Sequence, residues 1–286
     1  MSKTLRLTAP DWQAGAKEDY YFGAQMLSML APKSDQHIER TIPVSAPSGV
    51  ELQEENGVVE QAATLANVSN AKSIIAEEQP DRIITLGGNC LVSEAPFDYL
   101  HGKYGDTLGI IWFDAHPDIS TPEMFNHEHA MVLANLLRKG DPSHNRLVEH
   151  PFKPQDILYV GLQPLTTDEV PQMDKLGIAY AIQQEAMLSQ AAIRNWLQQS
   201  GYTKIALHWD LDVIDPTDYH SLYFNEPEVP MFAGSSCGHF KFTEVAKKIL
   251  EVQELADIVG FTIAEYLPWD AIRLRKALSD VNIFKS

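Results

Sequence analysis

Short apolar runs of strand length alternate with amphipathic helical stretches along the chain, and this alternation constrains the fold more than any other feature. The runs cover residues 82–86, 108–113, 157–161, 178–182, 205–209 and 258–263. They are rich in β-branched and aromatic residues and are apolar on both faces, which is typical of a parallel sheet covered by helices on both sides. The helical stretches are 58–78, 192–199, 242–252 and 269–278. We therefore expect one α/β domain over residues 1–286, a three-layer α/β/α fold with a mainly parallel sheet.

Two segments show neither a strand pattern nor a helix pattern. Residues 35–54 contain Pro43, Pro47 and Gly49 and are predicted to form a surface loop, and residues 216–238 form a second irregular region that directly follows a strand. Neither has the character of a linker between domains.

The charge balance restricts the partners. The chain of 286 residues has a net charge of -17, with 39 acidic and 22 basic residues. Nucleic acid and anionic membranes both require a basic surface, so we expect neither as a partner. The excess of acidic residues is compatible with a small cationic substrate.

The sequence shows no export signal or membrane span. No stretch approaches the roughly 18 apolar residues of a spanning helix, and the N-terminus has no apolar signal-peptide core. The two cysteines, Cys90 and Cys237, are too few for a disulfide scaffold. We therefore expect a cytoplasmic protein.

Acidic residues and a histidine follow two of the predicted strands. The run 108–113 leads directly into Asp114, His116 and Asp118, and the run 205–209 leads into Asp210 and Asp212. Alternate side chains of an extended backbone point to the same side, so each cluster can converge. Ligands of open α/β sheets collect at this carboxyl edge.

A divalent metal ion explains these clusters better than a purely structural role. Aspartate is also common in turns and caps, and one cluster alone would leave that alternative equally open. Two clusters at equivalent strand ends, one with a histidine, favour a metal that holds four carboxylates and an imidazole together. Such donors suit Mn²⁺, Fe²⁺, Co²⁺, Ni²⁺ or Zn²⁺ better than Ca²⁺.

Both clusters resemble the signatures of the ureohydrolases, the family of arginase, agmatinase and formimidoylglutamase. Asp114-Ala115-His116-Pro117-Asp118 is similar to the family's Asp-Ala-His-x-Asp, and residues 210–216 are similar to its Asp-x-Asp-x-x-Asp-Pro. The order and strand placement also match, and the resemblance extends from about residue 81 to residue 270. It implies an arginase-like α/β/α fold with a binuclear metal centre, usually of Mn²⁺.

The resemblance also implies roles for the individual residues. Asp114 and Asp210 would bridge both ions, His116 and Asp212 would complete one site, and Asp118 would join the other. The metals would activate a hydroxide that attacks the carbon of a small guanidino or amidino substrate, since a bound metal can lower the pKa of water from about 16 to about 7.

Two further residues match positions of the family. His129 lies where the family has a histidine that acts as a proton shuttle, and a histidine that titrates near neutrality suits this role. Glu265 follows the last strand, where the family has a glutamate that pairs with the substrate guanidinium. The alternative for each is a solvated side chain without a catalytic role.

The first metal site departs from the family pattern. The family has Gly-Gly-Asp-His after a strand, whereas this chain has Gly87-Gly88-Asn89-Cys90. Cys90 can bind a metal as a thiolate, which favours Zn²⁺ or Fe²⁺. Alternatively only the site with His116 is occupied, so that one ion binds, or both sites are lost.

Substrate recognition departs as well. After Asp118, arginases have an Asn and a polar loop that recognises the amino-acid end of arginine, but here Ile119-Ser120 follow. The Arg-Asp-x-Asp stretch of arginases is replaced by residues 162–169, and Tyr266 and Trp269 near Glu265 are candidates to shape a different pocket. We therefore expect a guanidino or amidino substrate other than L-arginine.

Three functions remain open. The first is a metal-dependent hydrolase of a linear, non-peptide C–N bond in a guanidino or amidino compound. The second is a deacetylase-like amidohydrolase with one Zn²⁺ at Asp114, His116 and Asp212, and the third is a catalytically silent scaffold of the same fold. Because the family forms homo-oligomers, often trimers or hexamers, we expect a homo-oligomer.

Overall fold

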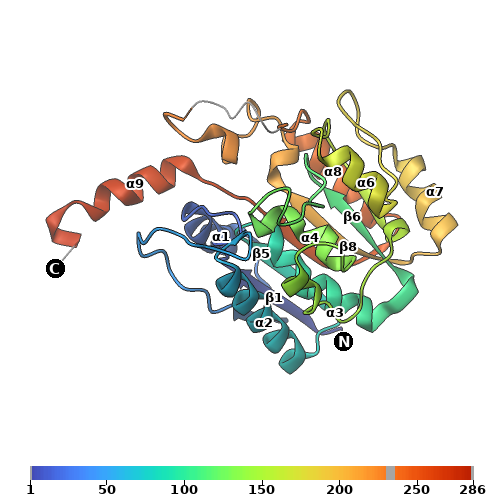
Figure 1. Cartoon of the computed structure of the whole chain (residues 1–286), viewed down its shortest axis with the longest axis horizontal. Coiled ribbons are helices and arrows are strands. Elements are labelled where there is room, and N and C mark those ends of the chain that lie inside the picture. Colours follow the sequence, from blue (N-terminus) through green and yellow to red (C-terminus); the bar gives the residue numbers. More distant parts are fainter. Residues whose placement is uncertain (1, 230–235, 285–286) are drawn as a thin grey trace.

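A seven-stranded parallel sheet forms the centre of the fold (Figure 1). The computed structural model describes residues 2–229 and 236–284. The strand order is β2-β1-β5-β9-β8-β6-β7, and each neighbouring pair is parallel. The strands are β1 (Thr4–Ala9), β2 (His37–Thr41), β5 (Arg82–Gly87), β6 (Leu108–Phe113), β7 (Ile157–Val160), β8 (Lys204–Asp210) and β9 (Asp257–Ala264).

Helices cover both faces of this sheet, as the doubly apolar strands predict. One apolar cluster packs α2, α3, α4 and α6 against the sheet, and a second packs α7 and α8. On β6, Ile110 and Trp112 belong to the first cluster and Ile111 and Phe113 to the second. The helices are α1 (Asp19–Leu30), α2 (Gln61–Glu78), α3 (Glu94–Tyr104), α4 (Val132–Leu136), α5 (Pro142–Asn145), α6 (Glu169–Leu176), α7 (Gln190–Ser200), α8 (Phe242–Gln253) and α9 (Trp269–Ser279).

The three-layer fold is therefore confirmed. That residues 1–286 form a single domain stays a prediction. The last helix, α9, projects away from the layers (Figure 1). Among the described residues, no helix combines the length and the apolar character that a membrane span requires.

The predicted strand at residues 178–182 is wrong, because this segment pairs with no strand. The side chain of Gln183 takes the place of a neighbouring strand at the edge of β7. Its Nε2 donates to the carbonyl of Tyr159 at 3.1 Å, and its Oε1 accepts from the amide of Gly161 at 3.1 Å. The apolar side chain of Ile178 is explained by its packing with residues of α6 in the first cluster.

The loop predicted for residues 35–54 is wrong at its start, where His37–Thr41 forms the edge strand β2. Only one residue of this strand is apolar, so no strand pattern is visible in the sequence. The helix predicted from residue 58 begins at Gln61, after a hairpin of β3 (Glu54–Glu55) and β4 (Val58–Val59). Asn56 and Gly57 at its turn have φ values of 52° and 83°, as an Asn-Gly hairpin turn requires.

A fully buried polar network joins α3 to the segment after the first aspartate cluster. The Nδ2 atom of Asn135 donates to Glu94 Oε2 at 2.9 Å and to Glu128 Oε1 at 2.6 Å. The amide of Asp141 donates to Asn135 Oδ1 at 2.9 Å. These bonds satisfy polar groups that would be costly to bury alone, so they fix α4 against α3.

His144 is the cation of this network. Its Nδ1 lies 3.1 Å from Glu94 Oε1, and its Nε2 lies 3.1 Å from Thr64 Oγ1. Because Thr64 Oγ1 donates its own proton to the carbonyl of Gln61, it accepts one from His144. Burial lowers the pKa of His144, but Glu94 and Glu128 outweigh this effect and raise the pKa to about 9. With both ring nitrogens donating, His144 has no lone pair for a metal.

We predict that the free energy of unfolding falls as the pH rises from about 6.5 to about 9, because folded His144 keeps a proton that the unfolded chain loses in this range. The raised pKa corresponds to about 3 kcal/mol. His144→Gln should flatten this dependence, whereas His220→Gln, at an exposed histidine, should not. Denaturant unfolding at several pH values measures the effect, and an unchanged slope in His144→Gln would contradict it.

Candidate metal centre

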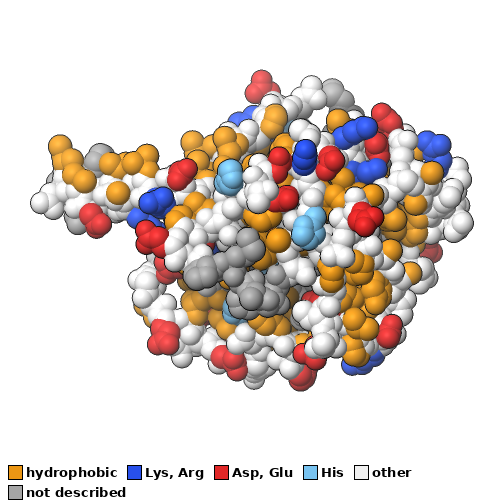
Figure 2. Space-filling view, turned by 90° about the horizontal axis from the view of Figure 1, so that it is seen from above, with side chains coloured by type: hydrophobic (Ala, Val, Ile, Leu, Met, Phe, Trp, Pro, Cys, Tyr) orange, Lys and Arg blue, Asp and Glu red, His pale blue; other side chains and the backbone are white. Residues whose placement is uncertain are grey.

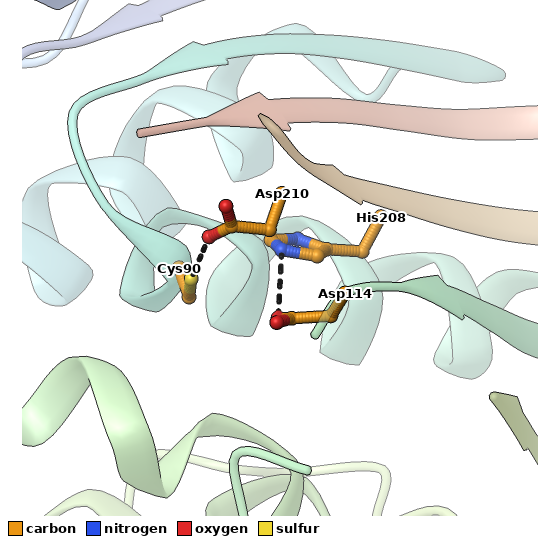
Figure 3. A group of neighbouring side chains, drawn as sticks. All are labelled: Cys90, Asp114, His208 and Asp210. Atoms are coloured by element: carbon orange, nitrogen blue, oxygen red, sulfur yellow. Dashed lines mark hydrogen bonds and ion pairs between the residues drawn. The ribbon is translucent and has the colours of Figure 1, made fainter. Parts of the chain in front are cut away.

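The predicted site residues meet at the carboxyl ends of the four central strands. Asp114 directly follows β6, Asp210 ends β8, Cys90 follows β5 in a short 3₁₀ helix (Cys90–Ser93), and Glu265 directly follows β9. Figure 3 shows Cys90, Asp114 and Asp210 turned toward one another. Parallel pairing brings these strand ends to one edge, as sequence reasoning predicts.

One half of the candidate centre consists of Asp114, His116 and Asp212. Their donor atoms lie within 4.8 Å of one another. The Nδ1 atom of His116 is 2.8 Å from Asp212 Oδ2 and 3.5 Å from Asp114 Oδ1. Backbone amides hold the two carboxylates, since His116 N donates to Asp114 Oδ1 and Ala115 N donates to Asp212 Oδ1. This half contains the donors expected for the second metal site.

The other half lies around Asp210. Its Oδ2 is 2.9 Å from Cys90 Sγ, and its Oδ1 accepts from the amide of Asp212 at 2.7 Å. Glu265 Oε1 is 4.0 Å from Cys90 Sγ. Donor atoms of Asp210, Asp212 and Glu265 also lie within 4.8 Å of one another. Cys90 thus lies among the acids, at the edge where the first metal site is expected.

Asp118 faces the same centre from a strained position. Its φ is 47°, in the left-handed region that non-glycine residues rarely adopt. Its side chain is buried, and within the described part of the chain Oδ2 has no hydrogen-bond partner. Asp118 is in none of the groups of three or more residues whose donor atoms lie within 4.8 Å of one another. Burial, together with the charges of Asp114 and Glu265, raises its pKa.

Burial and mutual repulsion oppose ionisation of these acids. None is more than 6% exposed. Burial, followed by the charge of Asp212, raises the pKa of Asp114 to about 7 and that of Glu265 to about 8, and the pKa of Asp210 is also raised. A bound cation would favour the charged forms of all these carboxylates. An unpartnered buried Oδ2 and a concentrated set of acids fit a divalent metal.

The segment that carries Glu265 is held tightly. Glu265 has a φ of 64°, and its amide donates to the carbonyl of Gly88 at 3.0 Å. A Cβ atom on Gly88 would lie 1.9 Å from the backbone oxygen of Asp11, so only glycine fits there. Tyr20 of α1 also lies against the Glu265 carboxylate, and burial with this charge raises the pKa of Tyr20. Strain of this kind is typical of functional sites.

Comparison with known proteins identifies the family. The model of the arginase family matches residues 25–271. The chain belongs to the arginase family. It is 26% identical over 206 residues to the mitochondrial arginase of Medicago truncatula, covering 71% of this chain and 54% of that one. It is 26% identical over 165 residues to the arginase of Entamoeba histolytica, covering 55% and 53%. The chain thus spans about half the length of the curated relatives it matches.

Solved structures of arginases share the fold of this family member. The Entamoeba histolytica arginase in complex with L-ornithine has a TM-score of 0.76 at 20% identity and covers 94% of this chain and 92% of that one. A putative agmatinase from Clostridium difficile has a TM-score of 0.59 at 18% identity and covers 97% and 93%. At such identities the likeness concerns the fold alone, and it confirms the predicted arginase-like architecture.

His129 of this arginase-family chain lies beside the centre, with its protonation fixed. Its Nδ1 donates to the carbonyl of Ala14 at 2.9 Å, which leaves the lone pair on Nε2. Burial lowers the pKa of His129 to about 4. The expected titration near neutrality is therefore wrong, because the ring is neutral at pH 7.

The predicted role of Trp269 in a substrate pocket is not supported by its contacts. Trp269 is buried with Trp12 and Tyr20, its Nε1 donates to the carbonyl of Leu222, and the ammonium of Lys17 lies 5.2 Å from the centre of its ring.

Two residues of this arginase-family site were missed by sequence reasoning. His208 is fully buried on β8, and its Nε2 lies 3.9 Å from Asp114 Oδ2. Its position two residues before Asp210 was a usable signal, because alternate residues of a strand share a face. Tyr20 gave no such signal, since it lies on α1, far from either motif.

We predict that Asp118→Asn stabilises the metal-free protein at neutral pH by about 1–3 kcal/mol, because burial opposes ionisation of Asp118 whereas the amide is neutral at every pH. Asparagine tolerates the left-handed backbone of this position. The same variant should show a smaller rise in melting temperature when a divalent metal is added, because it has lost a ligand. Thermal unfolding with and without metal tests both effects.

Asp168→Asn is the matched control, since Asp168 is an exposed acid. It should change neither stability nor the response to metal. Equal behaviour of the two variants would contradict a role of Asp118 in the centre.

Proposed function

We propose that this chain is a metal-dependent hydrolase of a linear C–N bond in a guanidino or amidino compound other than L-arginine. The observation that carries the proposal is the position of Glu265, whose carboxylate lies within 4.8 Å of donor atoms of Asp210 and Asp212. A carboxylate can bind a planar guanidinium by two parallel hydrogen bonds. Here it would hold that cation directly against a metal-binding cluster.

The metal would be held by the residues of the two motifs. His116 and Asp212 would complete one site, Asp118 and Cys90 would contribute to the other, and Asp114 and Asp210 would lie between them. The oxygen-rich half with one imidazole suits Mn²⁺, the ion usual in the family. A bound divalent metal supplies a water that is acidic enough to act as a nucleophile at neutral pH.

The side chains around the metal would orient the substrate and move its protons. Glu265 would pair with the guanidinium and turn its carbon toward the metal cluster. The Nε2 atom of His129 would accept a proton and return it to the departing amine as the C–N bond breaks and the new C–O bond forms. The hydrogen bond from Nδ1 to Ala14 leaves the lone pair on Nε2, which supports this role. The lowered pKa of the ring opposes it, because burial disfavours the protonated form.

Buried residues at the positions that would recognise the amino-acid end of arginine support a different substrate. Ile119 and Gln163 are completely buried, and Ser120 is 7% exposed. The Nε2 atom of Gln163 donates to the carbonyls of Gly161 and Gln183. These three side chains are buried and are not exposed to an α-amino acid in solution.

We predict that the metal-loaded protein releases urea, ammonia or formamide from at least one member of a panel of guanidino and amidino compounds, and more slowly from L-arginine. Glu265→Gln should lower kcat/KM by about 100-fold or more, because the charged half of a bidentate pair is lost. Glu251→Gln on α8 is the matched control, because Glu251 lies outside the centre and pairs with Lys248.

The outcomes separate the three candidate functions. Release of acetate from acetylated amines, with no cleavage in the guanidine panel, would support the deacetylase-like alternative. Protein that binds no metal and cleaves neither class would support the silent scaffold.

The predicted homo-oligomer is also a proposal. Leu274 and Leu278 on α9, with Val281 and Ile283 beyond it, are 41–77% exposed, and Figure 2 shows apolar side chains along this projection. Covering them with a second copy would remove apolar area from water. We predict a mass by light scattering of at least two chains, and a lower mass for Leu274→Glu than for the control Arg273→Glu. A monomeric wild-type chain would contradict the proposal.

A further inference from the structure

His208 has a position that neither sequence motif explains. It lies on β8 two residues before Asp210, so both side chains point to the same face of the sheet. Its cross-strand partner on β6 is Trp112, and the two rings stack with centroids 3.6 Å apart and an interplanar angle of 9°. The stacking holds the ring of His208 beside Asp210 and Asp114, as Figure 3 shows for these three residues.

The two ring nitrogens of His208 differ in their hydrogen bonding. The Nδ1 atom lies 2.8 Å from Ser93 Oγ, which is also fully buried. Within residues 2–229 and 236–284, Nε2 has no hydrogen-bond partner, although it is completely buried. When Nδ1–H donates to Ser93, the lone pair of Nε2 points toward Asp114. Histidines that bind metals typically have their other nitrogen held in this way.

A thiol and two carboxylates converge near Nε2. Donor atoms of Cys90, Asp114, His208 and Asp210 all lie within 4.8 Å of one another. Cys90 Sγ is 2.9 Å from Asp210 Oδ2, and His208 Nε2 is 3.9 Å from Asp114 Oδ2. With metal–ligand bonds of about 2.0–2.3 Å, the ligands of a tetrahedral zinc ion lie about 3.3–3.8 Å apart. Small side-chain movements would therefore complete such a site.

We propose that Cys90 and His208 together replace the histidine that the first metal site lacks, and that this site selects Zn²⁺ over Mn²⁺. His208 would supply the imidazole from β8, and Cys90 would supply a thiolate from the 3₁₀ helix after β5. Thiolate and imidazole ligands favour Zn²⁺, whereas Mn²⁺ prefers oxygen ligands. On binding, the thiol proton of Cys90 passes to solvent and the sulfur–metal bond replaces the S–H bond.

This inference depends on the proposed function only for the presence of a metal, and not on the substrate. It predicts a centre of two unlike sites, in which the half with His116 and Asp212 keeps the oxygen-rich character that suits Mn²⁺. The competing interpretation is that His208 only packs against Trp112. In that case its replacement would change stability and leave metal preference unaltered.

The test measures metal binding on the full chain without any assay of turnover. Metal-free protein is titrated calorimetrically with Zn²⁺ and with Mn²⁺, and the bound metal is then counted by elemental analysis. We expect one Zn²⁺ per chain to bind at least about 100-fold more tightly than Mn²⁺. Cys90→Ser and His208→Gln should each weaken this Zn²⁺ binding by about tenfold or more. Cys237→Ser and His220→Gln are matched controls that should leave it unchanged.

Cys90→Ser or His208→Gln could fail to fold, because both residues are buried. Spectroscopy of the unaltered protein tests the inference without these variants. Co²⁺ at the site should show a thiolate-to-cobalt charge-transfer band in the near ultraviolet, and ¹¹³Cd NMR should report one sulfur and at least one nitrogen ligand. Cys90→His should shift the preference toward Mn²⁺.

A Co²⁺ spectrum without sulfur ligation, or Zn²⁺ binding that is unchanged in a folded His208→Gln variant, would overturn the inference. Cleavage of a guanidino compound with Mn²⁺ alone in both sites would overturn it while leaving the proposed function intact. If the wild-type chain binds no metal, both proposals fail together.

Discussion

Repulsion among buried carboxylates is the constraint on which the rest of this structure depends. Asp114, Asp118, Asp210, Asp212 and Glu265 share one edge of the sheet, and burial together with their mutual charge opposes their ionisation. Among them only Asp212 has a lowered pKa, because the neighbouring His116 outweighs the effect of burial. A bound cation would offset this cost, which supports the proposed metal-binding role of these acids.

The surrounding fold holds these acids in place without neutralising them. Three parallel strands, β6, β8 and β9, bring them to one edge, and backbone amides fix the orientation of Asp114, Asp210 and Asp212. Behind this edge, Asn135 of α4 and the cationic His144 of α5 both bond to Glu94 of α3. The strained backbones of Asp118 and Glu265 persist because rigid neighbours determine them. These contacts hold a group of buried acids that repel one another.

The sequence predicted the central strands and the two aspartate clusters, because strong apolar runs end directly at them. Prediction from the sequence failed where the apolar pattern of a segment does not reflect its position in the fold. The edge strand His37–Thr41 is largely polar and exposed, and residues 178–182 are apolar but are kept from the sheet by the side chain of Gln183. His208 is hidden within a strand, and its proposed role depends on Ser93 and Cys90 in the 3₁₀ helix after β5 and on Trp112 of β6. Tyr20 reaches Glu265 from a helix that no motif marks.

The most direct measurement of the central claim is anomalous X-ray diffraction from crystals of the chain grown with Mn²⁺ and Zn²⁺, recorded at both absorption edges. A metal peak should lie within bonding distance of both Asp114 and Asp210, with His116 or Cys90 completing its ligands. Well-ordered carboxylates that enclose only water, in crystals grown with saturating metal, would contradict it.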